Sequence, residues 1–263
     1  MANAATGLVI QFRIATVSSS NFRFSIREGM MRSLYSGASM ALATLLLSGC
    51  IREARIAIPS QLAIASQRLE LTDMGAGERG QFQLGSSKGH FTRSAIHTAS
   101  EDGFLVQNSG GGTFVVAGPD VEGELSARCD FGEVEIHSGV VVATAQRFAY
   151  RCRFQRDGQP IEAGLILEEI PRSPGKLLSG RTRAGKLHFA DHVIGIRAIH
   201  DMEGGRMPTG TPLGYMFDIE GRQIGAVDLN GLNKTIHAPN SGPEREAVIA
   251  ASVALSILWD PGE

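Results

Sequence analysis

Residues 247–259 read AVIAASVALSILW, and this stretch contains no charged side chain. Before it, Ser241 to Glu244 has the form of a helix capping box with a proline in the first turn, and Pro261-Gly262 follows as a stop. These signals predict a helix over residues 242–259. A helix that is apolar on every side must be enclosed on every side. The uncharged stretch rises only about 20 Å, too short for an ordinary membrane span. We therefore expect it to lie inside a protein core.

The chain upstream of this helix has the pattern of strands joined by tight turns. Asp157-Gly158, Glu220-Gly221 and Asn230-Gly231 each separate apolar-periodic runs, as hairpin turns do. We also expect a turn or loop at the glycines of residues 110–112 and a long loop over residues 171–185. No change of composition divides this region. The pattern of strands and turns predicts a single, mainly β domain over residues 61–263. We expect an antiparallel barrel or sandwich that buries the apolar C-terminal helix.

A strand-rich chain that ends in a fully apolar helix resembles the Tubby C-terminal-like fold, which phospholipid scramblases and plant LURP-one-related proteins share. The segment from Gly214 through Gly225, Gly231 and the final helix carries the resemblance. It implies a closed antiparallel barrel around the helix; another barrel or sandwich with a packed helix is the alternative. Tubby proteins bind phosphoinositides through basic residues that we cannot match here, so the resemblance implies no ligand site.

The amino-terminal part of the sequence has the form of an export signal. Residues 30–35 read MMRSLY, residues 38–47 are apolar except for Ser39 and Thr44, and residues 47–50 read LSGC. A basic start, a short apolar segment and small residues before a cleavage point are typical of a secretory signal peptide. The apolar segment would rise about 15 Å as a helix, half of what a bilayer core requires. We therefore do not expect a permanent membrane span here.

Leu-Ser-Gly-Cys at residues 47–50 resembles the lipobox of bacterial lipoproteins. The resemblance implies that residues 30–49 are removed, that Cys50 carries diacylglycerol and usually a further acyl chain such as palmitate, and that residues 50–60 form a short tether. Because Ile51 and not aspartate follows the cysteine, it implies an outer-membrane lipoprotein facing the periplasm. Several acyl chains would anchor the protein stably. An ordinary secretory signal and a buried internal helix are the alternatives.

The position of the signal bears on where translation starts. Such signals begin at the first methionine, whereas 29 residues precede Met30 in this sequence. We expect translation to begin at Met30 or Met31, with residues 1–29 a misassigned upstream extension.

Without Cys50, two cysteines remain. Residues 124–131 and 147–154 alternate between apolar and polar side chains, which places Cys129 and Cys152 on the apolar faces of two predicted strands. If the strands are neighbours in an exported protein, a disulfide between them would close about 24 residues and contribute about 3 kcal/mol. Two buried free thiols are the alternative.

Composition and charge narrow the classes of function. The chain is 43% hydrophobic and 20% charged, which is typical of a folded globular protein. Its net charge is −2, and residues 1–49 hold four arginines against one acid, so the remainder carries about −5. A net acidic domain argues against general nucleic-acid binding, which needs a cationic surface.

The sequence shows no motif of a catalytic, metal or cofactor site. There is no Gly-x-Ser-x-Gly elbow, and Ser173-Pro174-Gly175-Lys176 satisfies Ser-x-x-Lys only in a segment expected to be a loop. On a strand, His188 and His192 would stand about 13 Å apart, too far for one metal ion. We therefore predict no catalytic residue, no metal and no cofactor.

One surface feature suggests a ligand. Between Glu169 and Asp191 the chain carries five cations and no acid: Arg172, Lys176, Arg181, Arg183 and Lys186. Such a run could meet anionic lipid headgroups or an acidic envelope component; a solvated loop is the alternative.

We expect a non-enzymatic, membrane-anchored domain for binding or envelope maintenance. The alternative is an envelope hydrolase whose groups converge only in the fold. A lipid-carrier barrel is disfavoured because the helix would fill its cavity.

Overall fold

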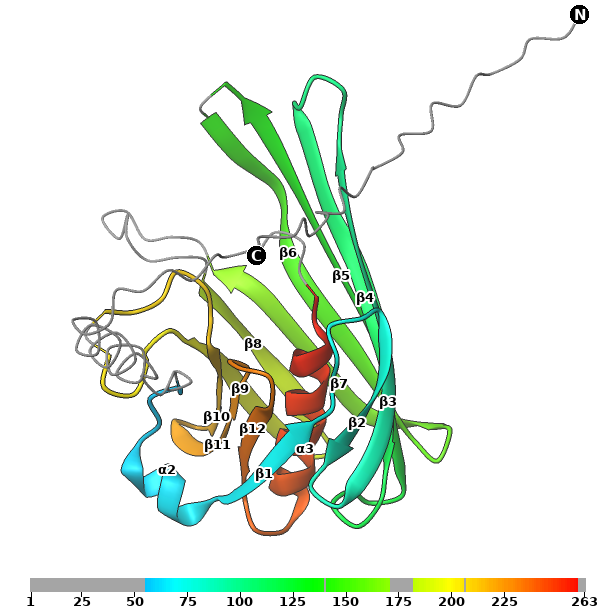
Figure 1. Ribbon diagram of the computed structural model, residues 1–263, viewed down its shortest axis with the longest axis vertical. Coiled ribbons are helices and arrows are strands. Elements are labelled where there is room, and N and C mark those ends of the chain that lie inside the picture. The colour runs from blue at the N-terminus through cyan, green and yellow to red at the C-terminus, as the bar shows by residue number, and fades with distance from the viewer. Residues whose placement is uncertain (1–54, 140, 171–181, 206, 260–263) are drawn as a thin grey trace, which may run out of the picture. The chain divides into compact units, whose positions relative to one another are not determined.

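The computed structural model describes residues 55–139, 141–170, 182–205 and 207–259, all within one compact unit. In these residues twelve antiparallel strands form a closed barrel (Figure 1), each pairing with the next along the chain, and β1 closes the ring on β12. The strands are β1 Gln67–Thr72, β2 Arg79–Leu84, β3 Ser87–Ala99, β4 Leu105–Ala117, β5 Glu124–Ser138, β6 Val141–Arg156, β7 Gln159–Ile170, β8 Thr182–Phe189, β9 His192–Ile199, β10 Gly214–Ile219, β11 Arg222–Asp228 and β12 Lys234–Ala238.

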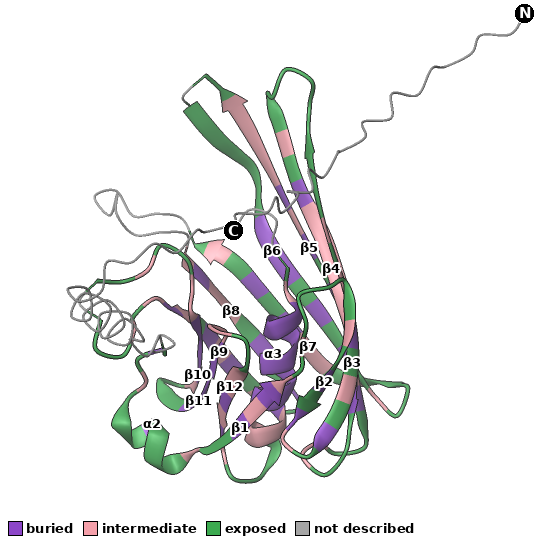
Figure 2. Ribbon diagram, in the orientation of Figure 1, coloured by how far each residue is buried: buried purple, intermediate pink, exposed green. Residues whose placement is uncertain are grey.

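Helix α3 (Pro243–Ile257) lies inside the barrel and forms its core. Every residue from 247 to 257 is buried (Figure 2), and the helix contacts strands on all sides of the ring, namely β3, β4, β5, β8, β11 and β12. Every strand supplies at least one buried apolar residue to the same core, and in most strands these residues alternate along the chain. The expectation of a mainly β domain with a buried C-terminal helix is confirmed, and the architecture is a barrel.

The start of α3 differs in detail from the prediction. Gly242, with φ of 88°, occupies the N-cap position, and no side chain caps the helix. The predicted capping box does not form because Ser241 lies one residue too early. Glu244 and Glu246 in the first turn complement the partial positive charge at the start of the helix.

Two of the three predicted hairpin turns are confirmed as two-residue turns, and the third lies in a longer connection between paired strands. Asp157-Gly158 joins β6 to β7 and Glu220-Gly221 joins β10 to β11, with positive φ at both residues of each turn. Gly231, with φ of 82°, lies in the connection between β11 and β12. Positive φ at two central residues gives a turn that matches the twist of antiparallel strands.

The prediction of a turn at the three glycines is wrong, because residues 110–112 lie within β4. A Cβ atom on Gly110 would stand 2.1 Å from the carbonyl oxygen of Ser94 and 2.7 Å from the ring of Phe131. One on Gly112 would stand 3.1 Å from Cδ1 of Ile257. The glycines therefore allow β4 to approach its neighbours and the last turn of α3 closely.

The chain before β1 packs on the outside of the barrel. Ile56, and Leu62 from helix α2 (Ser60–Ala65), form a small second core with Met216 and Ala226. The backbone N–H of Ile56 donates to a carboxylate oxygen of Asp228 at 3.0 Å. Residues 55–60 of the predicted tether are thus part of the folded unit. This cover explains why β10 and β11 are buried on both faces.

His237 of β12 lies half-buried in the groove beneath this segment. Burial is the main cause that lowers its pKa; Arg68 and Arg55 lower it further, and Asp228 and Glu70 oppose the change. The pKa of a histidine in the unfolded chain is near 6.5. When folding lowers this pKa, the histidine's contribution to the stability of the fold is complete above the unfolded-state pKa and is lost as the pH falls toward the folded-state pKa.

We therefore expect the unfolding free energy to decrease as the pH is lowered below about 6.5, and His237→Gln to flatten that slope. Urea unfolding at a series of pH values on both sides of about 6.5 would measure how the unfolding free energy depends on pH. The substitution His188→Gln, at an exposed histidine, is the matched control. Equal slopes for His237→Gln and the unchanged protein would refute this assignment.

Candidate functional site

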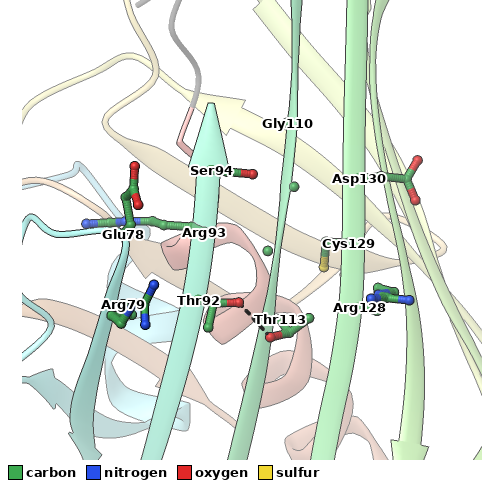
Figure 3. Close-up of a pocket in the computed structure, with 12 residues that line it drawn as sticks. Glu78, Arg79, Thr92, Arg93, Ser94, Gly110, Thr113, Arg128, Cys129 and Asp130 are labelled. Atoms are coloured by element: carbon green, nitrogen blue, oxygen red, sulfur yellow. Dashed lines mark hydrogen bonds between the residues drawn. The ribbon is translucent and has the colours of Figure 1, made fainter. Parts of the chain in front are cut away.

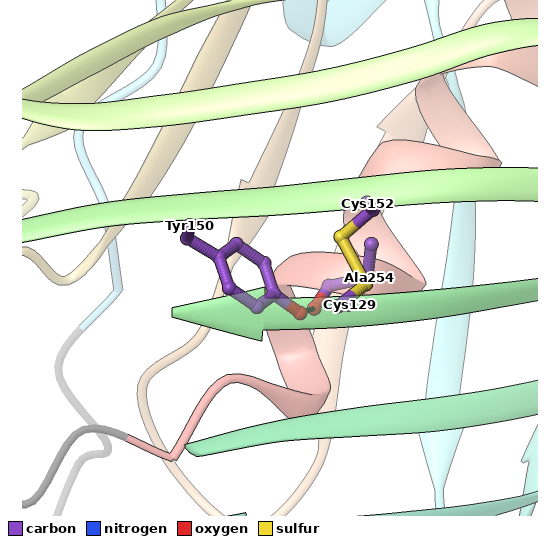
Figure 4. The surroundings of a disulfide bond; sticks show 4 residues. All are labelled: Cys129, Tyr150, Cys152 and Ala254. Atoms are coloured by element: carbon purple, nitrogen blue, oxygen red, sulfur yellow. Dashed lines mark hydrogen bonds between the residues drawn. A yellow bond between two sulfur atoms is a disulfide. The ribbon is translucent and has the colours of Figure 1, made fainter. Parts of the chain in front are cut away.

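Cys129 of β5 and Cys152 of β6 are directly opposite residues in the register, and they form a disulfide. Their Cα atoms are 4.0 Å apart, and both side chains are buried against α3 (Figure 4). The structure thus contains the predicted bridge.

Tyr150, two residues before Cys152, ties the same strand to the end of the helix. Its hydroxyl donates a 2.7 Å hydrogen bond to the carbonyl oxygen of Ala254 (Figure 4). This bond satisfies one of the carbonyls that a helix leaves without a partner at its C-terminus. Burial raises the pKa of Tyr150, so the side chain stays a neutral donor and fixes α3 in place.

Beyond the end of α3, the inner face of the barrel becomes polar. His97, Asn108 and Glu133 occupy one register across β3, β4 and β5. His97 Nδ1 lies 2.7 Å from Asn108 Oδ1, and Asn108 Nδ2 donates to Glu133 Oε2 at 3.3 Å. The next pair along β5 joins His137 to Glu135 at 3.1 Å. This row gives an ordered polar wall.

These histidines are not arranged with a nucleophile. Among the described side chains, no serine hydroxyl or cysteine thiol is hydrogen-bonded to a histidine, and His200 contacts a backbone carbonyl. The same part of the chain contains no group of three or more His, Cys, Asp or Glu residues that could hold a metal ion. His188 and His192 lie near the β8–β9 turn.

A cavity of about 460 Å³ opens where α3 terminates, and we call it the mouth cavity. Three strands far apart in sequence each direct one cation to it: Arg93 from β3, Arg183 from β8 and Lys234 from β12. Its apolar wall comes from two loops and the end of the helix, with Met74, Leu232, Leu255 and Leu258.

Each of the three cations is held in a defined position. Arg93 donates from Nε to the carbonyl of Gly77 at 3.0 Å and from Nη2 to that of Gly75 at 2.8 Å, and its guanidinium lies 5.3 Å from the ring of Trp259. Lys234 donates to the carbonyls of Leu229 and Gly231. Arg183 lies 4.0 Å over the ring of Phe148. Stacking and hydrogen bonds orient these charges.

The predicted cationic run does not form one surface in the part that is described. Arg183 is 1% exposed and points into the barrel, whereas Lys186 lies on the outside of β8. Arg172, Lys176 and Arg181 lie outside the described residues, as do Cys50 and Ser173. Arg93 and Lys234 could not be recognised as site residues from the sequence, because only closure of the ring brings them close to Arg183.

A second hollow, of about 440 Å³, lies over β2 to β5 on the outer face of the barrel (Figure 3). It follows the glycines of β4, and the hydroxyls of Thr92 and Thr113 are 2.9 Å apart on its floor. Charges of both signs surround it: Glu78, Arg79, Arg128 and Asp130. Mixed charge and neutral hydroxyls select no single class of ligand.

Comparison with protein families, with curated proteins and with solved structures found no match to this chain. No helix in the described ranges combines the length and the apolar character needed to cross a membrane.

Proposed function

We propose that this chain is an exported bacterial lipoprotein, anchored through lipid on Cys50 to the outer membrane and facing the periplasm, whose barrel is a non-enzymatic binding domain. The observation that carries the proposal is the order of residues 30–50, in which a basic start, a short apolar segment and Leu-Ser-Gly precede the cysteine. The bridge between Cys129 and Cys152 supports export, because such bonds persist in oxidising compartments and are rare in the cytosol.

The folded unit begins close to the proposed anchor. Ile56 is already buried against the barrel, six residues after Cys50. Because an extended residue spans at most about 3.6 Å, the barrel would be held within roughly 20 Å of the lipid-bearing sulfur. A tether this short favours a partner or ligand at the membrane surface.

A binding role is favoured over catalysis by what the described residues bring together. Helix α3 fills the part of the lumen that it spans, the described histidines lack a neighbouring nucleophile, and the mouth cavity gathers cations beside an apolar wall. These features suit recognition of a ligand more than the splitting of a bond.

Cys50→Ser tests the anchor. In Gram-negative cells fed an alkynyl palmitate, the unchanged protein is expected to carry the label in the outer-membrane fraction, because acylation requires the thiol. The variant should lose the label and leave that fraction. Cys129→Ala/Cys152→Ala is the control, which should keep the label. An unlabelled protein in the cytosol, or equal labelling after Cys50→Ser, would refute the proposal.

A further inference from the structure

We propose that the mouth cavity binds an anionic amphiphile, a molecule that joins a phosphate or carboxylate group to an apolar body. This inference rests on the proposed binding function and names its ligand class. The cavity volume of about 460 Å³ lies within the range of small-molecule sites, roughly 300–1,000 Å³.

The charge of the lining favours an anion. Arg93, Arg183 and Lys234 line the cavity, and no Asp or Glu is among the described residues that line it. Arg93 makes no ion pair within 4.0 Å in the described structure, since its hydrogen bonds go to neutral carbonyls of residues 75 and 77. A planar guanidinium presents several N–H donors to one oxyanion, which suits phosphate and carboxylate groups.

The remaining lining favours an apolar body attached to that anion. Leu255 and Leu258 come from the end of the helix, and Met74 and Leu232 from loops on either side. Leu232 is 89% exposed. A ligand with an alkyl part would cover this leucine while its charged group met the cations.

The fold alone gives another reason for cations at this position. The C-terminus of a helix carries about half a negative charge, and α3 has no basic residue in its last turn. Strand cations near Leu258 therefore stabilise the helix end. That role predicts changes in stability on substitution, but it predicts no saturable ligand.

The test measures binding directly through Trp259, the single tryptophan of the chain, which lies against Arg93. The lipidated protein is reconstituted in phosphatidylcholine vesicles and titrated with octyl phosphate, octanoate and inorganic phosphate. We expect a saturable change in fluorescence with octyl phosphate or octanoate, and binding of inorganic phosphate that is about tenfold weaker or more, because it lacks the apolar part.

Leu232→Glu is the main variant, because it adds a negative charge to an exposed position on the rim and disturbs little packing. It should weaken amphiphile binding about tenfold or more through repulsion of the anion. Ile64→Glu is the matched control: the side chain is 86% exposed on α2, away from the cavity lining, and the affinity should stay unchanged. Arg93→Gln should weaken binding as well.

Three results would overturn the inference. They are the absence of saturable binding by both amphiphiles, equal effects of Leu232→Glu and Ile64→Glu, and binding of inorganic phosphate as tight as that of octyl phosphate. The intact mass of the same sample reports acylation of Cys50 separately. Acylated protein that binds no amphiphile refutes only this inference, whereas binding by unacylated protein refutes only the anchor.

Discussion

Replacing Ala251 with glutamate is expected to prevent the barrel from folding. Ala251 lies in the middle of α3 and is fully buried. A carboxylate there would have neither water nor a partner, and burying an unpaired charge costs several kcal/mol in addition to the overpacking. Because whole domains are stable by only about 5–15 kcal/mol, a loss above about 4 kcal/mol leaves little folded protein.

Circular dichroism and thermal unfolding would show this loss. The matched control is Ala65→Glu, which makes the same change at an exposed position in helix α2 and should leave the melting temperature nearly unchanged. A cooperative transition for Ala251→Glu at the temperature of the unchanged protein would mean that α3 is not enclosed.

Removing the disulfide is expected to cost about 3 kcal/mol. The bridge between Cys129 and Cys152 has a sequence separation of 23 residues, and a constraint of this length removes chain entropy from the unfolded ensemble and raises its free energy by about that much. Alanine is the suitable replacement, because both side chains face the apolar core and serine would bury hydroxyls. For a domain of this size the melting temperature should fall by roughly 6–12 °C.

Urea unfolding with and without reductant separates the bridge from side effects of the substitutions. Reductant should move the curve of the unchanged protein onto that of Cys129→Ala/Cys152→Ala, and it should leave the variant unaffected. If the two proteins unfold at the same urea concentration without reductant, the bridge does not stabilise the fold.

Features that depend on local periodicity could be predicted from the sequence. The absence of charge from residue 247 to 259 identified the enclosed helix, and alternation around Cys129 and Cys152 placed both on inward faces. The turn at Glu220-Gly221 followed from the same kind of pattern. In each case the residues within one short segment determine the outcome.

Features that depend on contacts between distant segments could not be predicted. The glycines of β4 resemble a turn in sequence, but they are required by the approach of Ser94, Phe131 and Ile257. Residues 55–60 resemble a tether in sequence. The surface against which they pack is built by the distant strands β10 and β11, so their burial could not be predicted from the segment itself.

The candidate site also depends on contacts between distant segments, so it could not be predicted from the sequence. Arg183 was singled out with its sequence neighbours, whereas the structure places it at a cavity with Arg93 and Lys234. The three positions are separated by long stretches of chain, and only the closed ring and the end of α3 bring them together.

The enclosed helix also limits where a ligand can bind. Along its length, α3 occupies the space between the strands in which an open barrel would hold a lipid tail. A small ligand is therefore expected at the mouth cavity, where the helix ends.

Amide hydrogen exchange of residues 247–257 would show whether α3 is the core around which the barrel closes. We expect these amides to exchange as slowly as the best-protected strand amides, only through global unfolding. If α3 exchanged through local opening while β4 to β7 stayed protected, the helix would not be an enclosed core.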